Sequence, residues 1–150
     1  MKILFLHGLE SSPGGQKPTI LRNAGYEVIE PMLPSDNWVD SVNAAQEAYD
    51  EEQPDIIVGS SRGGAVAMAA DLPAAKMILI APAWKKYCPS CTISPGTTII
   101  HSPDDEVIAF ADSRLLSKMF GAELIRGGSN HRMNDASAMS KLIQVVKGGQ

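Results

Sequence analysis

Cysteines, clustered positive charges and long apolar runs are all scarce in this chain of 150 residues. Two cysteines are too few for the disulfide framework that stabilises small secreted domains. The net charge is −4 and the lysines and arginines are scattered, so the sequence lacks the basic surface that nucleic acid or an anionic membrane would bind. We therefore expect neither nucleic acid nor a membrane as a partner.

Targeting and nucleotide-binding patterns are also missing. The apolar run near the first residue stops at His7 and Gly8, which is too short for the core of a signal peptide or for a membrane span. The phosphate-binding patterns Gly-x-Gly-x-x-Gly and Gly-Lys-Ser/Thr do not occur. These absences predict a cytoplasmic protein that works without a cofactor or a metal ion.

Short β-branched apolar runs are what the sequence does contain, and they alternate with helical patterns. Near-continuous hydrophobicity is typical of strands covered on both faces, as in parallel sheets. The sequence therefore predicts one α/β domain over residues 1–150, with a doubly wound, mostly parallel sheet of six strands and ligands bound beyond the strands' carboxyl ends. The expected strands are 2–6, 27–30, 55–58, 76–80, 97–101 and 123–125, and the expected helices lie around 19–24, 38–49, 62–70, 108–119 and 136–146.

The clearest chemical signal is the segment Gly59-Ser60-Ser61-Arg62-Gly63, which lies between an apolar strand and a run of small helix-forming residues. A strand, a tight turn and a buried helix around Gly-x-Ser-x-Gly are the setting of a nucleophile elbow. The glycines let the two arms of the turn pass closely, and the helix N-terminus favours a developing oxyanion. We expect Ser61 to be a nucleophile; the alternatives are a plain glycine-rich loop or an anion site at the helix start.

Two further strand ends carry the other residues that an activated serine needs. Asp105 follows the fifth expected strand, and His131 lies in a glycine-rich loop after the sixth. A histidine can accept the serine's proton because imidazole titrates near neutrality, and a carboxylate behind the ring fixes its tautomer. The chain order of Ser61, the acid and His131 is that of α/β-hydrolases. We select Asp105 over its neighbours Asp104 and Glu106, which are candidates for helix capping.

The glycine-rich loop after the first expected strand lies where α/β-hydrolases place their second oxyanion-hole donor. We assign the oxyanion hole to the backbone N–H groups of Leu9 and Arg62. We expect His7 to shape this loop through hydrogen bonds rather than to act as a base. Trp84 and Tyr87, after the fourth expected strand, are candidate walls of the substrate pocket, although both residues would serve equally well as a roof over the core.

Two features have more than one interpretation. The Arg62 side chain can bind a substrate carboxylate or phosphate, but we favour a structural ion pair with Glu10 from the neighbouring loop. Cys88 and Cys91 are spaced like a redox pair, yet they lie in a loop without the helix that activates such thiols, and one pair is half a zinc site. We expect these thiols to be incidental.

Four pieces of the sequence share a pattern with one family, and they are His7-Gly8-x-x-Ser11-Ser12-Pro13, Gly59-Ser60-Ser61-x-Gly63-Gly64, Asp105-Glu106-Val107 and Gly127-Gly128-x-Asn130-His131. Together they resemble the small YqiA-type esterases of the α/β-hydrolase superfamily and, less closely, the RBBP-type serine hydrolases. The resemblance spans nearly the whole chain. It implies a minimal α/β-hydrolase fold with little or no cap, in which Ser61, Asp105 and His131 hydrolyse short acyl esters.

The chain departs from that family in two ways. Arg62 replaces an apolar residue that is common at its position, and the chain is short after the fourth expected strand, where larger hydrolases carry a cap. The missing cap implies an open site with weak selection on acyl size. The sequence thus predicts a carboxylesterase-like serine hydrolase acting on a small acyl ester or thioester. The alternatives are a thioesterase or amidase with the same residues, or a non-catalytic binding module with this fold.

Overall fold

Six parallel strands form one sheet in the computed structural model, which describes residues 1–9, 13–73 and 75–148. The strand order is β2-β1-β3-β4-β5-β6, and every neighbouring pair is parallel. The strands are β1 (Lys2–Leu6), β2 (Glu27–Ile29), β3 (Ile56–Ser60), β4 (Lys76–Ile80), β5 (Thr98–His101) and β6 (Glu123–Arg126).

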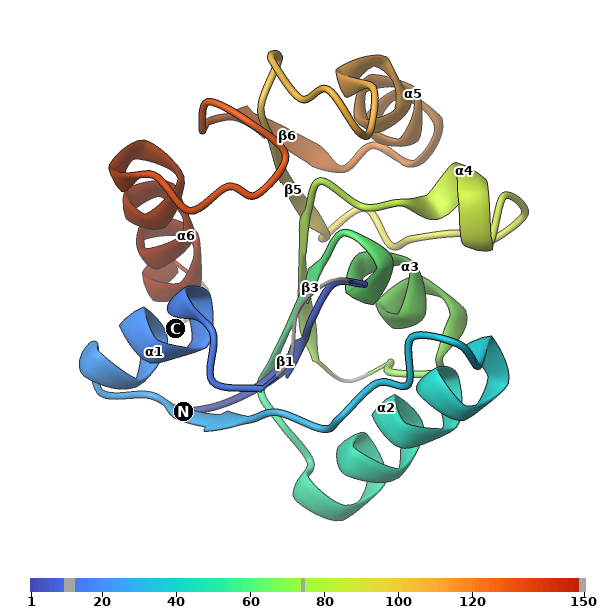
Figure 1. The fold of residues 1–150 in the computed structure, drawn as a ribbon, viewed down its shortest axis with the longest axis vertical. Coiled ribbons are helices and arrows are strands. Elements are labelled where there is room, and N and C mark those ends of the chain that lie inside the picture. Colours follow the sequence, from blue (N-terminus) through green and yellow to red (C-terminus); the bar gives the residue numbers. More distant parts are fainter. Residues whose placement is uncertain (10–12, 74, 149–150) are drawn as a thin grey trace.

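Helices cover both faces of this sheet (Figure 1). One layer consists of α1 (Gln16–Asn23) and α6 (Ala136–Gly148), and the other of α2 (Trp38–Glu52), α3 (Arg62–Ala69), α4 (Trp84–Tyr87) and α5 (Phe110–Phe120). Successive strand residues point to opposite faces. On β3, Ile57 therefore packs in the core under α2 and α3, while Ile56 and Val58 pack in the core under α1 and α6. Two-sided burial is the reason for the continuous apolar runs in the sequence.

The strand order reverses at β1, which creates the position where such sheets bind ligands. The chain leaves β1 through α1 to form β2 on one side, and then returns to form β3 on the other side of β1. The loops that follow β1 and β3 therefore run toward opposite faces and open a crevice at the carboxyl edge of the sheet. The turn that carries Ser61 is one wall of this crevice.

The expected fold is confirmed, and the differences concern the ends of elements and one additional short helix. β3 extends to Ser60 because β4 continues beside it, with Ile80 in register with Ser60. α5 begins at Phe110 rather than at 108 because the preceding loop is occupied with hydrogen bonds to Asp105. The short helix α4 was not expected. Within the described residues, no helix has both the length and the apolar character needed to cross a bilayer.

Candidate active site

Ser61 lies at a strained turn between β3 and α3. Its backbone has φ of 56° and ψ of −117°, a conformation that residues with a side chain rarely adopt. The turn closes only because glycines flank it: a Cβ on Gly59 would lie 2.7 Å from the carbonyl oxygen of Gly63, and one on Gly63 would overlap the carbonyl oxygen of Leu6. The expected elbow geometry is therefore present, and it holds the Ser61 hydroxyl at the edge of the cavity.

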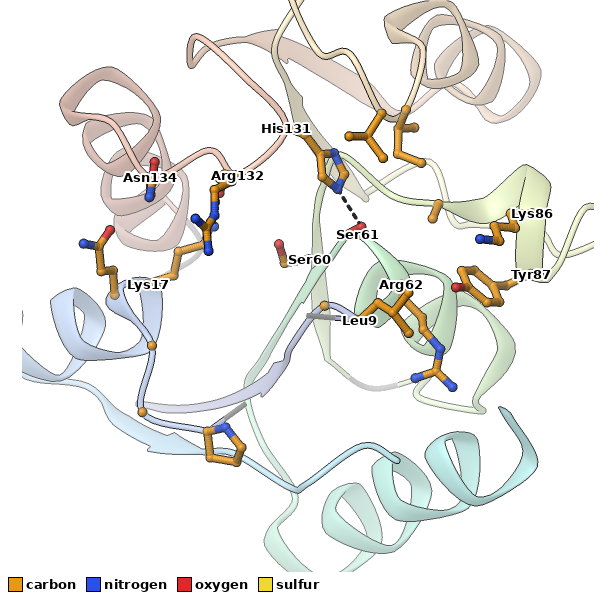
Figure 2. Close-up of a pocket in the computed structure, with 18 residues that line it drawn as sticks. Leu9, Lys17, Ser60, Ser61, Arg62, Lys86, Tyr87, His131, Arg132 and Asn134 are labelled. Atoms are coloured by element: carbon orange, nitrogen blue, oxygen red, sulfur yellow. Dashed lines mark hydrogen bonds between the residues drawn. The ribbon is translucent and has the colours of Figure 1, made fainter. Parts of the chain in front are cut away.

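The structure brings Ser61, His131 and Asp105 together across 70 residues of sequence. Ser61 Oγ lies 2.9 Å from His131 Nε2, and His131 Nδ1 lies 2.8 Å from Asp105 Oδ2 (Figure 2). Because a carboxylate only accepts hydrogen bonds, Nδ1 carries the proton and donates to Asp105. Nε2 is then free to accept the hydrogen of the Ser61 hydroxyl. This is the arrangement that general-base activation of a serine requires.

Asp105 is the acid that meets the histidine, whereas Asp104 is exposed to solvent. Its second oxygen, Oδ1, accepts the backbone N–H groups of Val107 and Ile108, each at 2.8 Å. Burial alone would raise the pKa of Asp105, but these hydrogen bonds and the contact with His131 outweigh it and hold the pKa below the usual 3.8. Asp105 is therefore a fully hydrogen-bonded carboxylate at neutral pH.

A second histidine, which sequence reasoning missed, contacts the same carboxylate from behind. His101, at the end of β5, is completely buried, and its Nε2 lies 2.9 Å from Asp105 Oδ2 and 3.1 Å from the carbonyl oxygen of Ile108. Both partners are acceptors, so Nε2 carries a proton. Nδ1 lies 2.6 Å from the hydroxyl of Ser113. Burial lowers the pKa of His101 more than the charge of Asp105 raises it, so the ring is neutral.

The candidate oxyanion-hole donors lie beside the serine. Leu9 and Arg62 both line the cavity with Ser61, and Arg62 is the first residue of α3, so its N–H has no partner within the helix. His7 is buried behind the first loop: its Nε2 accepts the N–H of Leu33 at 3.0 Å, which leaves the proton on Nδ1 for the carbonyl of Gly8 at 2.9 Å. His7 thus shapes the loop through hydrogen bonds, as the sequence indicated.

The Arg62 side chain is buried, and its guanidinium points away from Ser61 (Figure 2). Nη1 donates to the hydroxyl of Ser41 at 3.0 Å and Nη2 to the carbonyl of Pro34 at 3.1 Å. Its Cζ lies 5.5 and 5.4 Å from the ring centroids of Trp38 and Tyr87. These contacts give the side chain a bracing role. Glu10, the partner expected from the sequence, lies outside the described residues.

The cavity around Ser61 has a volume of about 750 Å³ and is bordered by the loop after β1, the elbow, α4 and the loop before α6. Tyr87 lines it, as expected. Trp84 does not: it is 4% exposed, lies in the core, and donates its Nε1–H to the carbonyl of Asp112 at 3.1 Å. Of the two interpretations of Trp84, the structure therefore supports the roof over the core and not the pocket wall, because α4 turns this ring inward and leaves Tyr87 at the cavity.

The two cysteines lie beside α4 as free thiols. Cys88 is buried, and burial together with a hydrogen bond to Cys91 raises its pKa to about 12. A thiol with so high a pKa is a poor nucleophile near neutral pH, which agrees with an incidental role. Across the described ranges 1–9, 13–73 and 75–148, no group of three or more His, Cys, Asp or Glu residues is placed to hold a metal ion.

Comparisons with protein-family models and with curated proteins found no match. Solved structures do match. A protein of the alpha/beta hydrolase superfamily from Xanthomonas campestris pv. campestris has a TM-score of 0.80 at 21% identity, over 96% of this chain and 97% of that one. The ydeN gene product from B. subtilis has a TM-score of 0.78 at 15% identity, over 99% and 97% of the two chains.

A third match extends the comparison to an esterase. The esterase domain of a Rhodothermus marinus protein has a TM-score of 0.72 at 16% identity, over 98% of this chain and 84% of that domain. This chain therefore has the α/β-hydrolase fold. It has that fold in a reduced form, since between β4 and β5 the chain forms only α4 and loops.

Proposed function

We propose that the protein is a serine hydrolase that cleaves small acyl esters through an acyl-enzyme on Ser61. The observation that carries the proposal is the unbroken line of hydrogen bonds from Ser61 Oγ through His131 to Asp105, at a strained turn that faces a cavity. The shared fold with an esterase domain and with other members of the alpha/beta hydrolase superfamily supports the same class of reaction.

The reaction proceeds in two halves. Ser61 Oγ attacks the ester carbonyl carbon while His131 Nε2 takes the hydroxyl proton, and the resulting oxyanion accepts hydrogen bonds from the N–H groups of Leu9 and Arg62. The tetrahedral intermediate collapses, and His131 gives the proton to the departing alcohol. Water then attacks the acyl-enzyme with His131 again as the base, which releases the carboxylic acid and restores Ser61. Asp105 holds the ring tautomer and stabilises the imidazolium in both halves.

Hydrolysis of short 4-nitrophenyl esters tests this proposal. We expect turnover by the wild type and loss of turnover in Ser61→Ala. Ser60→Ala is the matched control, because Ser60 lines the same cavity one residue before the nucleophile and has no part in the proton transfer. The proposal fails if purified, folded wild type hydrolyses no acyl ester, thioester or amide, or if Ser61→Ala retains the wild-type rate. Matched acetyl esters, thioesters and anilides would rank the leaving groups.

A further inference from the structure

The charged side chains around the cavity have one sign. Lys17, Lys86 and Arg132 line it beside His131, and no aspartate or glutamate is found among its described lining residues. The chain as a whole is acidic, with 17 Asp and Glu against 13 Lys and Arg. A cationic cavity in an acidic protein is therefore a local arrangement and does not follow from composition.

Two of these cations lie together on the α1 and α6 side of Ser61 (Figure 2). Lys17, in the first turn of α1, donates through Nζ to the backbone carbonyl of Arg132 at 2.5 Å, 115 residues away. This contact fixes the ammonium group beside the residue that follows His131. An ammonium group has three donors, so Lys17 retains two for a ligand.

Neither side chain has an anionic partner within residues 1–9, 13–73 and 75–148. Among the described residues, no carboxylate forms an ion pair with Lys17 or Arg132, and the Arg132 guanidinium makes no hydrogen bond. Elsewhere cations do find acids: Arg22 pairs with Glu30 at 2.6 Å, and Lys85 pairs with Asp112 at 3.0 Å. No carboxylate of the described residues thus neutralises the pair at the cavity, which leaves both charges available to a ligand.

The surroundings of Lys17 lower the pKa of its ammonium group. Burial and the positive charge of Arg132 lower its pKa from 10.5 to about 8. The half-buried Lys17 and the exposed Arg132 repel each other, and an anion bound between them would offset that repulsion. Perturbed groups in a cleft are typical of sites that act on a ligand.

Building on the hydrolase function proposed above, we infer that the substrate carries a carboxylate or phosphate group, which Lys17 and Arg132 bind on the α1 and α6 side of Ser61. Arg132 supplies the fork of donors that matches such a group, and Lys17 supplies a second positive charge. The anion belongs either to the acyl half of the ester or to its alcohol half. Both have the same recognition chemistry, and two series of substrates distinguish them.

The first series places the anion on the acyl half. The 4-nitrophenyl monoesters of succinate, glutarate and adipate are compared with the butyrate, valerate and hexanoate esters, in which a methyl group replaces the carboxylate. The second series places it on the alcohol half, with 4-acetoxybenzoate compared with its methyl ester. We expect wild-type kcat/KM to favour the anionic member of one series about tenfold to a hundredfold, as charge-assisted hydrogen bonds do.

Variants locate the preference within the cavity. In Lys17→Met and Arg132→Gln we expect the ratio of anionic to neutral kcat/KM to fall about tenfold, and the ratio cancels any loss common to both esters. Lys86→Met is the matched control, because it removes a cation from the opposite side of the same cavity and should keep the ratio. Equal rates for anionic and neutral esters in the wild type, or loss of the preference only in Lys86→Met, would overturn the inference.

A binding measurement separates this inference from the hydrolase function. Calorimetry on Ser61→Ala compares succinanilate with butyranilide, and 4-acetamidobenzoate with its methyl ester, none of which needs to react. We expect the anion of one pair to bind about tenfold more tightly than its neutral partner, and Arg132→Gln in the same background to abolish the difference. Equal binding within both pairs contradicts anion recognition even if the wild type hydrolyses esters. Selective binding without turnover contradicts the hydrolase function alone.

Discussion

Asp105 lies between two histidines, one at the cavity and one in the buried interior, and both contact the same carboxylate oxygen. His131 approaches Oδ2 from the cavity side at 2.8 Å and has Ser61 on its other nitrogen. His101 approaches Oδ2 from the interior at 2.9 Å and has Ser113 on its other nitrogen. One ring faces a site where a proton can be exchanged with substrate, and the other is completely buried.

The difference shows that position, and not residue type, assigns the role. The His131 ring lies at the cavity beside Ser61, so it can take a proton from the serine hydroxyl and pass it to a leaving group. A buried neutral ring keeps its proton on Nε2 and acts as a fixed donor. His131 is thus the candidate base, and His101 is a positioning residue for Asp105. Substitutions at each ring and at the carboxylate between them test whether the two rings differ as much as their surroundings do.

The largest effect is expected at the cavity-side ring. Among the described residues, His131 is the only side chain that forms a hydrogen bond with Ser61 Oγ, and His131→Ala removes it. We expect kcat on a neutral ester to fall about 10⁶-fold, as in serine hydrolases that lose their base. Steady-state kinetics measures this, and circular dichroism verifies the fold. A loss under about tenfold would mean that His131 is not the base.

The next largest effect is expected at the shared carboxylate. In Asp105→Asn the side-chain amide cannot accept from both rings and from the N–H groups of Val107 and Ile108, so the ring tautomer at the cavity is lost. We expect kcat to fall about 10⁴-fold. Asp104→Asn is the matched control at the exposed neighbour and should change kcat little. Equal activities of the two variants would contradict the assignment of Asp105.

A smaller effect is expected at the buried ring. His101→Gln weakens a buried hydrogen bond to Asp105 worth about 1.5–3 kcal/mol, so we expect kcat to fall about tenfold to a hundredfold. With less of its charge engaged from behind, Asp105 should attract the protonated base more strongly. The acid limb of the kcat/KM profile should therefore move to higher pH, which a merely structural loss would not cause. A reduced rate with an unmoved profile would restrict His101 to packing.

The smallest effect concerns stability against pH. The pKa of His101 is lowered in the folded state, so below about pH 6.5 the unfolded chain binds a proton that the folded chain does not. The stability that depends on this group is complete above the unfolded pKa and declines as the pH falls through it. Urea unfolding between pH 5 and 8 should show this decline, with a smaller slope in His101→Gln. Parallel slopes for the two proteins would contradict a neutral His101.

Much of the site could be predicted from sequence because its strongest signals are local. Gly59 and Gly63 flank Ser61 within five residues, and the alternation of apolar runs fixes which loops share the carboxyl edge of the sheet. Once that edge was defined, Asp105 and His131 had to lie near Ser61. The same reasoning explains why strand boundaries were less accurate: the extension of β3 depends on where β4 ends, which local sequence does not state.

The remaining features depend on contacts that no local pattern encodes. His101 ends β5 at the same edge and stands four residues before Asp105, and a polar residue at a buried strand end was the signal available to find it. The sequence does not distinguish Trp84 from Tyr87, because a single turn of helix, α4, decides which ring faces the cavity. The hydroxyl of Ser41, which accepts from Arg62, lies 21 residues away.

Trapping with a fluorophosphonate probe tests whether His131 and Asp105 make Ser61 an activated nucleophile. Intact mass is measured after treatment of the wild type, Ser61→Ala and the Ser60→Ala control. We expect one adduct on the wild type and on Ser60→Ala, and none on Ser61→Ala. An unlabelled wild type that is folded, or an adduct that persists in Ser61→Ala, would contradict the activation of Ser61.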